Sequence, residues 1–437
     1  MEQEEKKLDL EKLKTVHFIG IGGIGVSALA RMMMLRGIRV SGSDISLSPI
    51  TEELKRLGTS VFEGHGRKNV PTNASLIIYT LAIGLDNPEL VEAREKELPL
   101  MTYPEALGEI SRQYFTVAVS GTHGKTTTTG MIGKVFTDAG LKPTVLIGSI
   151  LKDEKSNFIG GEGKYFITEA CEYRRSFLNL SPKVVVITNI DDDHLDYYED
   201  IEDIEKAFAE LAEKLPADGF LICDAHDPRL AKAIKRSPGK VIDYKEYYDE
   251  NLRLRVPGKH NLLNAAAALA LADVLHIKDE VAIEALEAFS GTWRRFEYNG
   301  KTKAGALLYD DYAHHPTEIK ATLRALREKF PDKHLTIVFQ PHLYSRTKIL
   351  LKSFGEAFKD ADSVLIAPIY AAREPNDPSI SAQILAANIK LKTERALAFS
   401  NFEAIVNHLK KTLKQDGVLM TMGAGDVNKV GEALLRL

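Results

Sequence analysis

The sequence predicts an α/β protein with three domains in series. Two observations lead to this prediction. Short apolar runs alternate with longer amphipathic stretches along the whole chain, which is the pattern of parallel sheets covered by helices. Glycine-rich turns also follow the leading strand in two of the three series, at residues 20–25 and 121–124. The length of 437 residues is sufficient for two or three ordinary hydrophobic cores.

The first predicted domain covers residues 1–108. It opens with a strand at 15–20 (TVHFIG), after which the apolar residues of 20–37 switch to helical spacing. A second strand follows at 39–44 (RVSGSD), and further alternation continues through 74–80 (ASLIIYT). A strand, helix and strand in this order imply a parallel sheet.

The second predicted domain covers residues 109–298 and has the same character. Its helix at 261–276 (NLLNAAAALALADVLH) is alanine-rich and nearly apolar, so we expect it to be packed on both sides. The other predicted elements are strands at 114–120, 142–148, 164–170 and 183–190 and a long helix at 201–216.

The third predicted domain covers residues 299–437. Strands at 335–340 (LTIVFQ), 363–369 (SVLIAPI) and 417–423 (GVLMTMG) alternate with helices such as 316–330. This is again the pattern of a parallel sheet, so all three domains are expected to be α/β.

Composition narrows the classes of partner. Apolar residues make up 44% and charged residues 27% of the chain, and the net charge is −4, so there is no overall basic surface for nucleic acid. No apolar run approaches the ~18 residues of a membrane span. The N-terminus is charged and does not resemble a secretory signal. Two cysteines, Cys171 and Cys223, cannot form a disulfide framework, which fits a reducing compartment and a cytoplasmic protein.

The run GTHGKTTTT predicts a phosphate-binding loop. It lies between a strand and a helix, where glycines allow backbone N–H groups to approach an anion and the helix N-terminus faces the same point. Lys125 would reach the β- and γ-phosphates of a nucleotide, and Thr126 would bind Mg²⁺ through its hydroxyl. The usual first glycine is replaced by Val119, so the loop is a shorter variant, and the alternative is a plain turn that caps the helix. The residues of the predicted loop are Gly121, Thr122, His123, Gly124, Lys125, Thr126 and Thr127.

Two residues at strand ends are candidate metal ligands. Glu169 ends one predicted strand, and His194 follows the next. Ligands gather at the carboxyl ends of strands in open α/β sheets, and Mg²⁺ prefers oxygen ligands, which favours Glu169. Chemistry alone favours a loop hydrogen-bonding role for His194, and the acidic string around it is also consistent with a solvated turn.

The first glycine motif has two functional interpretations. Its glycines fit G-x-G-x-x-G, and Asp44 ends the next strand, which is the dinucleotide fingerprint of a Rossmann-like domain and suggests an NAD-dependent dehydrogenase. A tight glycine turn at a helix N-terminus binds any diphosphate, however, including that of a UDP-linked ligand. No hydride-transfer site accompanies the motif, so a non-redox ligand is favoured over NAD and over a purely structural turn. The candidate residues are Gly20, Gly22, Gly23, Gly25 and Asp44.

Four further stretches carry polar side chains of functional type. Asn261 and Asn264 lie one helical turn apart and could contact a base edge or cap a loop. Arg295, beside the only tryptophan, could reach a phosphoryl oxygen or form a surface ion pair. YDDYAHHPTE, which contains Asp311, is unusually dense in titratable groups for a solvated loop. FQPHLYSRT supplies His342 and Arg346, which suit a small carboxylate or an ordinary surface loop.

Taken in order, these motifs resemble the Mur ligases of peptidoglycan synthesis over essentially the whole chain. The motifs that carry the resemblance are HFIGIGGIGVS, GTHGKTTTT, EACEYRRSFLNLSP, TNIDDDHLDYY, GKHNLLNAA, RRFE, DDYAHHPTE, FQPHLYSRT and GAGD. The resemblance implies an N-terminal Rossmann-like UDP-binding domain, a central P-loop ATPase-like domain and a C-terminal Rossmann-like domain. It implies an ATP-dependent amide ligation through an acyl phosphate, in which L-alanine is joined to the carboxylate of UDP-N-acetylmuramate. Such a reaction belongs to cell-wall precursor synthesis, and with it to cell shape and division.

The resemblance also implies roles for individual residues, with ATP and Mg²⁺ as cofactors. Lys125 and Thr126 would hold ATP and Mg²⁺, with Glu169 and His194 as metal ligands. Asn261 and Asn264 would lie at the adenine. Arg295 and Asp311 would close over the nucleotide, and His342 and Arg346 would contact the amino acid. The enzyme is expected to be a monomer or a weak homodimer.

Two departures from the family pattern and three rival functions remain. Cys171, Arg174 and Arg175 replace residues of an acidic string found in many relatives, and Leu343 stands where many have arginine. The nearest rival is a recycling ligase that attaches a whole tripeptide to the same UDP-sugar. The others are an NAD-dependent dehydrogenase and a non-enzymatic ATP-binding switch or scaffold.

Overall fold

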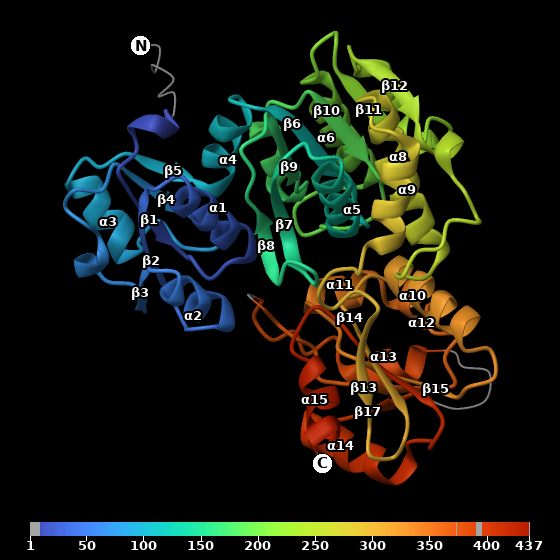
Figure 1. Cartoon of the computed structure of the whole chain (residues 1–437). Coiled ribbons are helices and arrows are strands. Elements are labelled where there is room, and N and C mark those ends of the chain that lie inside the picture. The colour runs from blue at the N-terminus through green and yellow to red at the C-terminus, as the bar shows by residue number, and fades with distance from the viewer. Residues whose placement is uncertain (1–8, 373, 390–395, 437) are drawn as a thin grey trace. The chain divides into compact units, whose positions relative to one another are not determined.

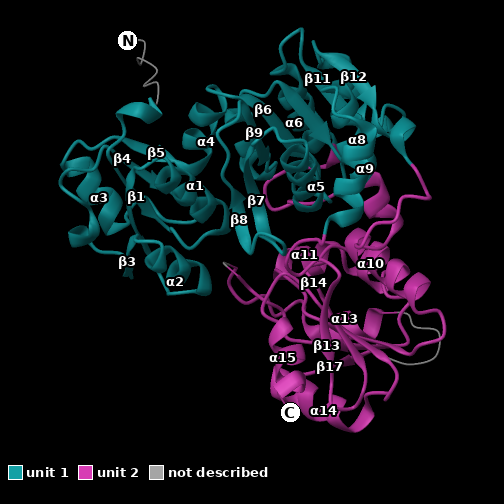
Figure 2. Cartoon of the chain, viewed as in Figure 1, with its two compact units in different colours: residues 1–191, 202–248, 264–289 teal, residues 192–201, 249–263, 290–437 magenta. Residues whose placement is uncertain are grey.

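The computed structural model describes residues 9–372, 374–389 and 396–436 and contains three sheets with flanking helices (Figure 1). Contacts divide the chain into two compact units (Figure 2). Unit 1 holds residues 1–191, 202–248 and 264–289, and unit 2 holds residues 192–201, 249–263 and 290–437. The prediction of α/β domains with parallel sheets is confirmed. The first two sheets share unit 1, and the third lies in unit 2.

The first sheet has five parallel strands in the order β3-β2-β1-β4-β5. Its central strand β1 is buried along its whole length, and its buried His17 has hydrogen-bond partners in Ser41 and Glu89. The strands are β1 (Thr15–Ile19), β2 (Arg39–Asp44), β3 (Ser60–Glu63), β4 (Leu76–Tyr79) and β5 (Leu100–Thr102). The helices are η1 (Leu10–Lys12), α1 (Ile24–Leu35), α2 (Pro49–Arg56), η2 (Arg67–Asn69), α3 (Pro88–Glu95) and α4 (Tyr103–Ser111).

The second sheet has seven strands in the order β12-β11-β10-β6-β9-β7-β8. All adjacent pairs are parallel except β7 with β8. The strands are β6 (Phe115–Ser120), β7 (Thr144–Leu151), β8 (Ser156–Ile159), β9 (Tyr165–Glu169), β10 (Val184–Ile187), β11 (Phe220–Cys223) and β12 (Lys240–Asp243). The helices of this stretch are α5 (Lys125–Asp138), η3 (Tyr173–Asn179), α6 (Ile201–Glu213), η4 (Pro228–Leu230), α7 (Ala231–Arg236), η5 (Tyr244–Tyr247), α8 (Lys259–Val274) and α9 (Asp279–Ala288).

The third sheet has six strands in the order β13-β14-β18-β15-β16-β17, with only β13 antiparallel to its neighbour. The strands are β13 (Glu297–Lys301), β14 (Leu307–Asp311), β15 (Leu335–Phe339), β16 (Ser363–Ile366), β17 (Leu397–Ala398) and β18 (Val418–Met422). The helices are α10 (Pro316–Lys329), α11 (Tyr344–Ile349), α12 (Leu351–Gly355), α13 (Ala382–Asn388), α14 (Phe402–Thr412) and α15 (Asn428–Arg436).

The second sheet differs from the sequence prediction at one edge. The predicted strand at 142–148 continues to Leu151 and turns back as the antiparallel hairpin β7–β8. The alanine-rich α8 agrees with its prediction, because the alanines at 265–268 are all at most 1% exposed. None of the helices in the described ranges is both long and apolar enough to cross a membrane.

Candidate active site

The loop between β6 and α5 can be formed only with glycine at two positions. Gly121 has φ +126° and Gly124 has φ +85°, in the region that residues with a side chain rarely adopt. A Cβ at Gly121 would lie 2.0 Å from Oγ1 of Thr188, and one at Gly124 would lie 2.6 Å from Oδ1 of Asn264. Both glycines are therefore required by conformation and by space.

The residues that follow β10 fix this loop through hydrogen bonds. The backbone N–H of Thr122 donates to the carbonyl of Asn189 at 3.0 Å, and the N–H of His123 donates to its side-chain oxygen at 3.0 Å. The hydroxyl of Thr188 donates to the carbonyl of His123 at 2.6 Å. The loop is thus fixed in shape by hydrogen bonds, as a preformed anion site must be.

Lys125, at the first position of α5, is half-buried, with its side chain 16% exposed, and it stays charged. Its ammonium group donates to the carbonyls of Gly121 at 2.5 Å and Thr122 at 3.1 Å and pairs with Glu172 at 2.9 Å. Burial disfavours the charged form, but the carboxylate of Glu172 outweighs it and raises the pKa of Lys125. A cation therefore lies at the helix N-terminus, where a phosphate would bind.

Glu169 lies beside the loop for a topological reason. β9 pairs with β6 so that Glu169 is opposite Val119, one residue before the end of β6. Its carboxylate accepts from the N–H of Gly148 at 2.5 Å, and a Cβ at Gly148 would lie within 2.7 Å of that carboxylate. Thr126, which is 8% exposed, follows Lys125 in the first turn of α5. Carboxylate and hydroxyl oxygens are the ligand types that Mg²⁺ prefers, so Glu169 and Thr126 fit the predicted metal site chemically.

The first glycine motif forms a second tight loop, between β1 and α1. Gly20 has φ +83°, and the N–H groups of Gly20 and Ile21 donate to the carbonyl of Ser43 at 2.8 and 3.0 Å. The N–H of Gly22 donates to the carboxylate of Asp44 at 2.8 Å. The N–H groups of this loop are therefore bonded to the end of β2, which fixes the shape of the turn at the N-terminus of α1.

The remaining residues of this motif pack closely at the start of α1. Gly23 is the N-cap residue of the helix. A Cβ at Gly25 would lie 2.6 Å from the hydroxyl oxygen of Tyr103.

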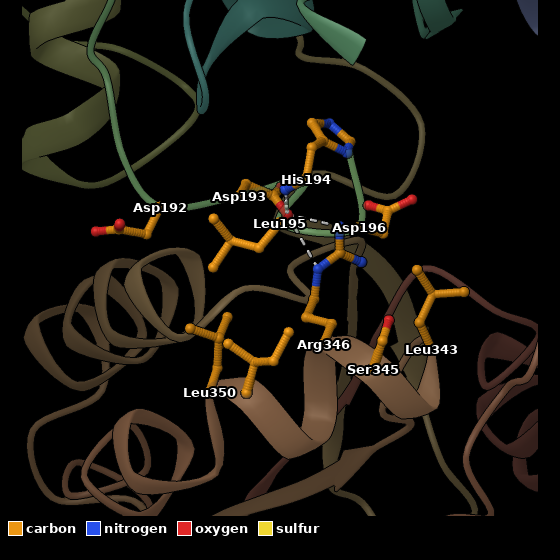
Figure 3. A pocket seen from close by; sticks show the side chains of 10 residues that line it. Asp192, Asp193, His194, Leu195, Asp196, Leu343, Ser345, Arg346 and Leu350 are labelled. Carbon is orange, nitrogen blue, oxygen red and sulfur yellow. Dashed lines mark hydrogen bonds and ion pairs between the residues drawn. The ribbon is translucent and has the colours of Figure 1, made fainter. Parts of the chain in front are cut away.

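Unit 2 contains a pocket in which an acid and an arginine meet (Figure 3). It is lined by Asp192, Asp193, His194, Leu195, Asp196, Leu343, Ser345, Arg346, Ile349 and Leu350. The guanidinium of Arg346 donates to Oδ1 of Asp193 through Nη2 at 2.7 Å and Nε at 3.1 Å. His194, the predicted metal ligand, lies at the same pocket with φ +54°.

The charge of Asp193 is strongly favoured in this pocket. Burial acts to raise the pKa of its carboxyl group, but His194 and Arg346 outweigh burial and hold the pKa well below its usual range. The acid therefore stays ionised and fixes Arg346, whose side chain is 8% exposed.

His342, from the same motif, lies next to Arg346. Nη1 of Arg346 lies 3.0 Å from Nδ1 of His342, whose ring stacks on Tyr370 with centroids 5.7 Å apart. The ring of His314 lies 5.8 Å from that of His342. Burial lowers the pKa of His314 to about 3, so this ring is neutral at physiological pH.

The two arginines of TWRRFE have different environments. Arg294 is buried and donates to Asp310 at 2.5 Å and to the carbonyls of Gly425 at 2.6 Å and Gly423 at 2.8 Å. Arg295, the predicted functional residue, is 29% exposed and lies 3.7 Å from Glu318. Arg294 therefore anchors the loop, and Arg295 is the arginine that solvent can reach.

Asp311 has its two carboxylate oxygens on backbone groups. It accepts from the N–H of Phe296 at 2.7 Å and of Ala313 at 2.8 Å. Burial raises the pKa of its carboxyl group to about 6, although Arg295 opposes the shift. These contacts tie together the segments that carry Arg295 and the histidines of YAHHP.

The two predicted asparagines of α8 have separate contacts. The amide of Asn261 donates to the carbonyl of Pro257 at 2.8 Å. The side-chain oxygen of Asn264 packs against Gly124 of the phosphate loop. Asn264 therefore lies beside the loop between β6 and α5, while Asn261 contacts the segment before α8.

Sequence reasoning missed three polar residues of these sites. Glu172 and Asp193 lie next to predicted positions in EACEYRRS and DDDH, so proximity to a motif was the available signal. Tyr103 carries no motif, and only the packing of α4 against α1 reveals it.

Known proteins match this chain along nearly its whole length. Family models match residues 15–115 (Mur ligase family, catalytic domain), 119–253 (Mur ligase middle domain) and 294–425 (Mur ligase, glutamate ligase domain). A UDP-N-acetylmuramate–L-alanine ligase of Clostridium botulinum strain Langeland is 42% identical over 98% of both chains. One of Clostridium acetobutylicum is 42% identical over 97% of both.

Solved structures give the same grouping. The UDP-N-acetylmuramate–alanine ligase MurC of Thermotoga maritima has a TM-score of 0.80 and 28% identity, covering 97% of this chain and 98% of that one. The murein peptide ligase of Psychrobacter arcticus has a TM-score of 0.71, covering 97% of this chain and 98% of that one. Its sequence identity of 23% supports a shared fold only. The chain belongs to the Mur ligase family.

Proposed function

We propose that this chain is an ATP-dependent ligase that joins L-alanine to the carboxylate of UDP-N-acetylmuramate. The observation that carries the proposal is the 42% identity to alanine ligases along 98% of both chains. The two glycine loops support it, because a UDP-sugar and ATP each bring a phosphate chain that such a loop can bind.

The reaction consists of two balanced steps. A carboxylate oxygen of UDP-N-acetylmuramate attacks the γ-phosphorus of ATP, which forms an acyl phosphate and releases ADP. The amine of L-alanine then attacks the acyl carbon, an amide bond forms, the amine loses a proton, and inorganic phosphate leaves. Positioning and charge stabilisation are the contributions required of the protein.

Lys125 supplies the positive charge at the phosphate loop. Glu172 keeps its ammonium group ionised. The N-terminus of α5 would present its first-turn N–H groups to the same phosphates. Arg295 would add a second cation on the nucleotide. Asp311 would hold the segment that carries Arg295 in place through Phe296 N–H.

The metal site would be formed by Thr126, Glu169 and His194. Mg²⁺ bound there supplies positive charge to the phosphate oxygens. Thr126 and Glu169 provide the oxygen ligands that Mg²⁺ favours, while a histidine is a less common ligand. The N–H of Gly148 orients the Glu169 carboxylate.

The binding roles of the other predicted residues are part of the proposal. His342 and Arg346 would bind the carboxylate of L-alanine, with Asp193 holding Arg346 in position. The glycine loop at 20–25 and Asp44 would bind the UDP-sugar. Asn261 and Asn264 would lie at the adenine side of ATP.

We also propose a cytoplasmic enzyme that acts as a monomer or weak homodimer. The substrates support the location, since ATP and UDP-activated sugars are cytoplasmic metabolites. Cys171 and Cys223 are both free thiols, which fits a reducing compartment.

The second candidate is a ligase that attaches a tripeptide to the same UDP-sugar. It is favoured only by the fold match to murein peptide ligases. The identity to alanine ligases along the whole chain favours the first proposal.

Phosphate release tests the proposal directly. The purified protein is given ATP, Mg²⁺ and UDP-N-acetylmuramate, with L-alanine, glycine, L-serine, tripeptide or no amine. Release that requires both the UDP-sugar and L-alanine is the expected result. Release with tripeptide alone would establish the recycling ligase. In a parallel assay with added NAD, NAD reduction without phosphate release would establish a dehydrogenase.

A further inference from the structure

We propose that the hydroxyl group of Tyr103 donates a hydrogen bond to an anionic oxygen of the bound UDP-sugar, between the two phosphate loops. This inference rests on the proposed function, because it names a further substrate-binding residue of that site. Tyr103 is the first residue of α4, the helix that follows the last strand of the first sheet.

The hydroxyl group of Tyr103 lies next to Gly25. An ideal Cβ at Gly25 would lie 2.6 Å from Oη of Tyr103 and 2.9 Å from Cζ. The end of the phenol ring therefore lies directly over the first turn of α1, beside the glycine loop. A residue with a side chain at position 25 would displace it, so the glycine provides the space that the hydroxyl occupies.

Side-chain hydrogen bonds are present at both ends of α4. Thr102 caps its N-terminus by accepting from the N–H of Glu105 at 3.3 Å, and the carboxylate of Glu105 accepts from the N–H of Thr102 at 2.7 Å. At the other end, the hydroxyl of Ser111 accepts from the N–H of Ser181 at 2.9 Å. The C-terminal end of the helix is thus tied to the segment that follows Glu172, and the capping box fixes the backbone at Tyr103.

Tyr103 also lies near Glu169, which is beside the second glycine loop. Burial raises the pKa of the phenol, and the carboxylate of Glu169 adds to the shift, so Glu169 is close enough to interact electrostatically with the ring. Gly25 lies on the side of the UDP-sugar loop and Glu169 on the side of the ATP loop. A neutral donor in this place suits a substrate that reaches from one loop to the other.

The hydroxyl group of Tyr103 is available as a hydrogen-bond donor. In the described part of the chain, the phenol of Tyr103 makes no hydrogen bond, and its side chain is only half-buried. A donor that is close to two anion sites and has no protein acceptor is available to a ligand. The acceptor would be either a diphosphate oxygen or the carboxylate of the muramic acid group.

The test is Tyr103→Phe in the full chain, which keeps the ring and removes only the hydroxyl. We expect the Kd for UDP-N-acetylmuramate, measured by calorimetry, to rise about 10- to 100-fold, as for loss of a hydrogen bond to a charged group. The KM for ATP and the thermal unfolding temperature should stay as in the wild type. A Kd within about twofold of wild type would overturn the proposal.

Free UDP distinguishes the two acceptors. UDP carries the diphosphate but lacks the carboxylate. Equal weakening for UDP and the UDP-sugar assigns the hydrogen bond to the diphosphate, and weakening for the UDP-sugar alone assigns it to the carboxylate. Since binding is measured without turnover, a wild-type protein that binds UDP-N-acetylmuramate but adds no alanine would contradict the proposed function and leave this test intact.

Tyr114→Phe is the matched control. The hydroxyl of Tyr114 is also buried without a hydrogen bond in the described chain, and its ring packs on Phe166 with centroids 5.6 Å apart, under Arg36. It lies outside both glycine loops. Loss of UDP-sugar binding in the control as well as in Tyr103→Phe would indicate a general packing defect and would contradict a specific hydrogen bond.

Discussion

Single residues in this protein combine burial with charge, and Lys125 shows the consequence most clearly. Its ammonium group is held by two loop carbonyls and Glu172. We expect Lys125→Ala to lower kcat by at least about 100-fold, because one preorganised charge is removed from the phosphoryl-transfer site. Calorimetry with UDP-N-acetylmuramate should give an unchanged Kd.

Lys134→Ala is the control for that experiment, since Lys134 lies on the same helix and pairs with Asp138. Its turnover should equal that of the wild type. If Lys125→Ala retained full turnover, the assignment of the phosphate loop would be wrong.

Arg294 and Arg295 are adjacent, yet we expect opposite results from their substitution. Arg294→Ala should lower the free energy of unfolding by about 3–5 kcal/mol, because it leaves Asp310 buried without its partner. Arg295→Ala should leave stability nearly unchanged, since its ion pair with Glu318 is long and partly exposed, and should instead lower kcat. Urea unfolding and steady-state kinetics of both variants separate the two roles. A stable Arg294→Ala protein would contradict the anchoring role.

Asp311 predicts a pH dependence of stability with a defined sign. Its pKa is raised from 3.8 to about 6 in the folded state. Between these values the folded protein binds more protons than the unfolded chain, so this contribution is fully present below pH 3.8 and is lost as the pH rises through about 6. In Asp311→Asn this part of the pH dependence should disappear from urea unfolding curves between pH 4 and 7. An unchanged slope would show that another group titrates there.

At the scale of elements, the sequence predicts the strands that carry ligand loops well. β1, β6, β10 and β15 are short, largely apolar runs rich in β-branched residues, and all of their residues except Phe115 at the start of β6 are buried. Local pattern predicts such strands, because strands buried on both faces are mostly apolar.

Elements set by long-range contacts could not be predicted in the same way. The hairpin β7–β8 depends on contacts with α1, where Asn157 donates to the carbonyl of Ile24 at 2.6 Å and the hydroxyl of Ser27 at 2.8 Å. These partners are more than a hundred residues away, so neither periodicity nor turn composition reveals them. Glu172 and Tyr103 could not be predicted for the same reason, because their contacts with Lys125 and Gly25 join segments that are distant in the sequence.

Asn157 therefore tests whether the hairpin stabilises the start of α1. The residue is 2% exposed, so Asn157→Ala removes two buried hydrogen bonds, although the carbonyl of Ile24 still accepts from the hydroxyl of Ser27 at 2.9 Å. We expect a loss of about 1–3 kcal/mol in the free energy of unfolding. The exposed Asn251, changed to Ala, serves as the control and should have no effect. Equal stability of the two variants would show that water replaces the Asn157 contacts at no cost.

At the scale of the whole molecule, the division into two compact units predicts how ligands stabilise the chain. The first two sheets belong to unit 1, and the third sheet, with its own buried core, belongs to unit 2. The glycine loop at 20–25 lies in unit 1, so UDP at 100 times its Kd should stabilise that unit by about 2.7 kcal/mol. Hydrogen exchange should show slower exchange in β1 and β2 on adding UDP, with β15 and β18 unchanged. Equal slowing in all four strands would mean that the two units unfold as one cooperative body, and the loss of protection in unit 2 at lower urea than in unit 1 would show that they do not.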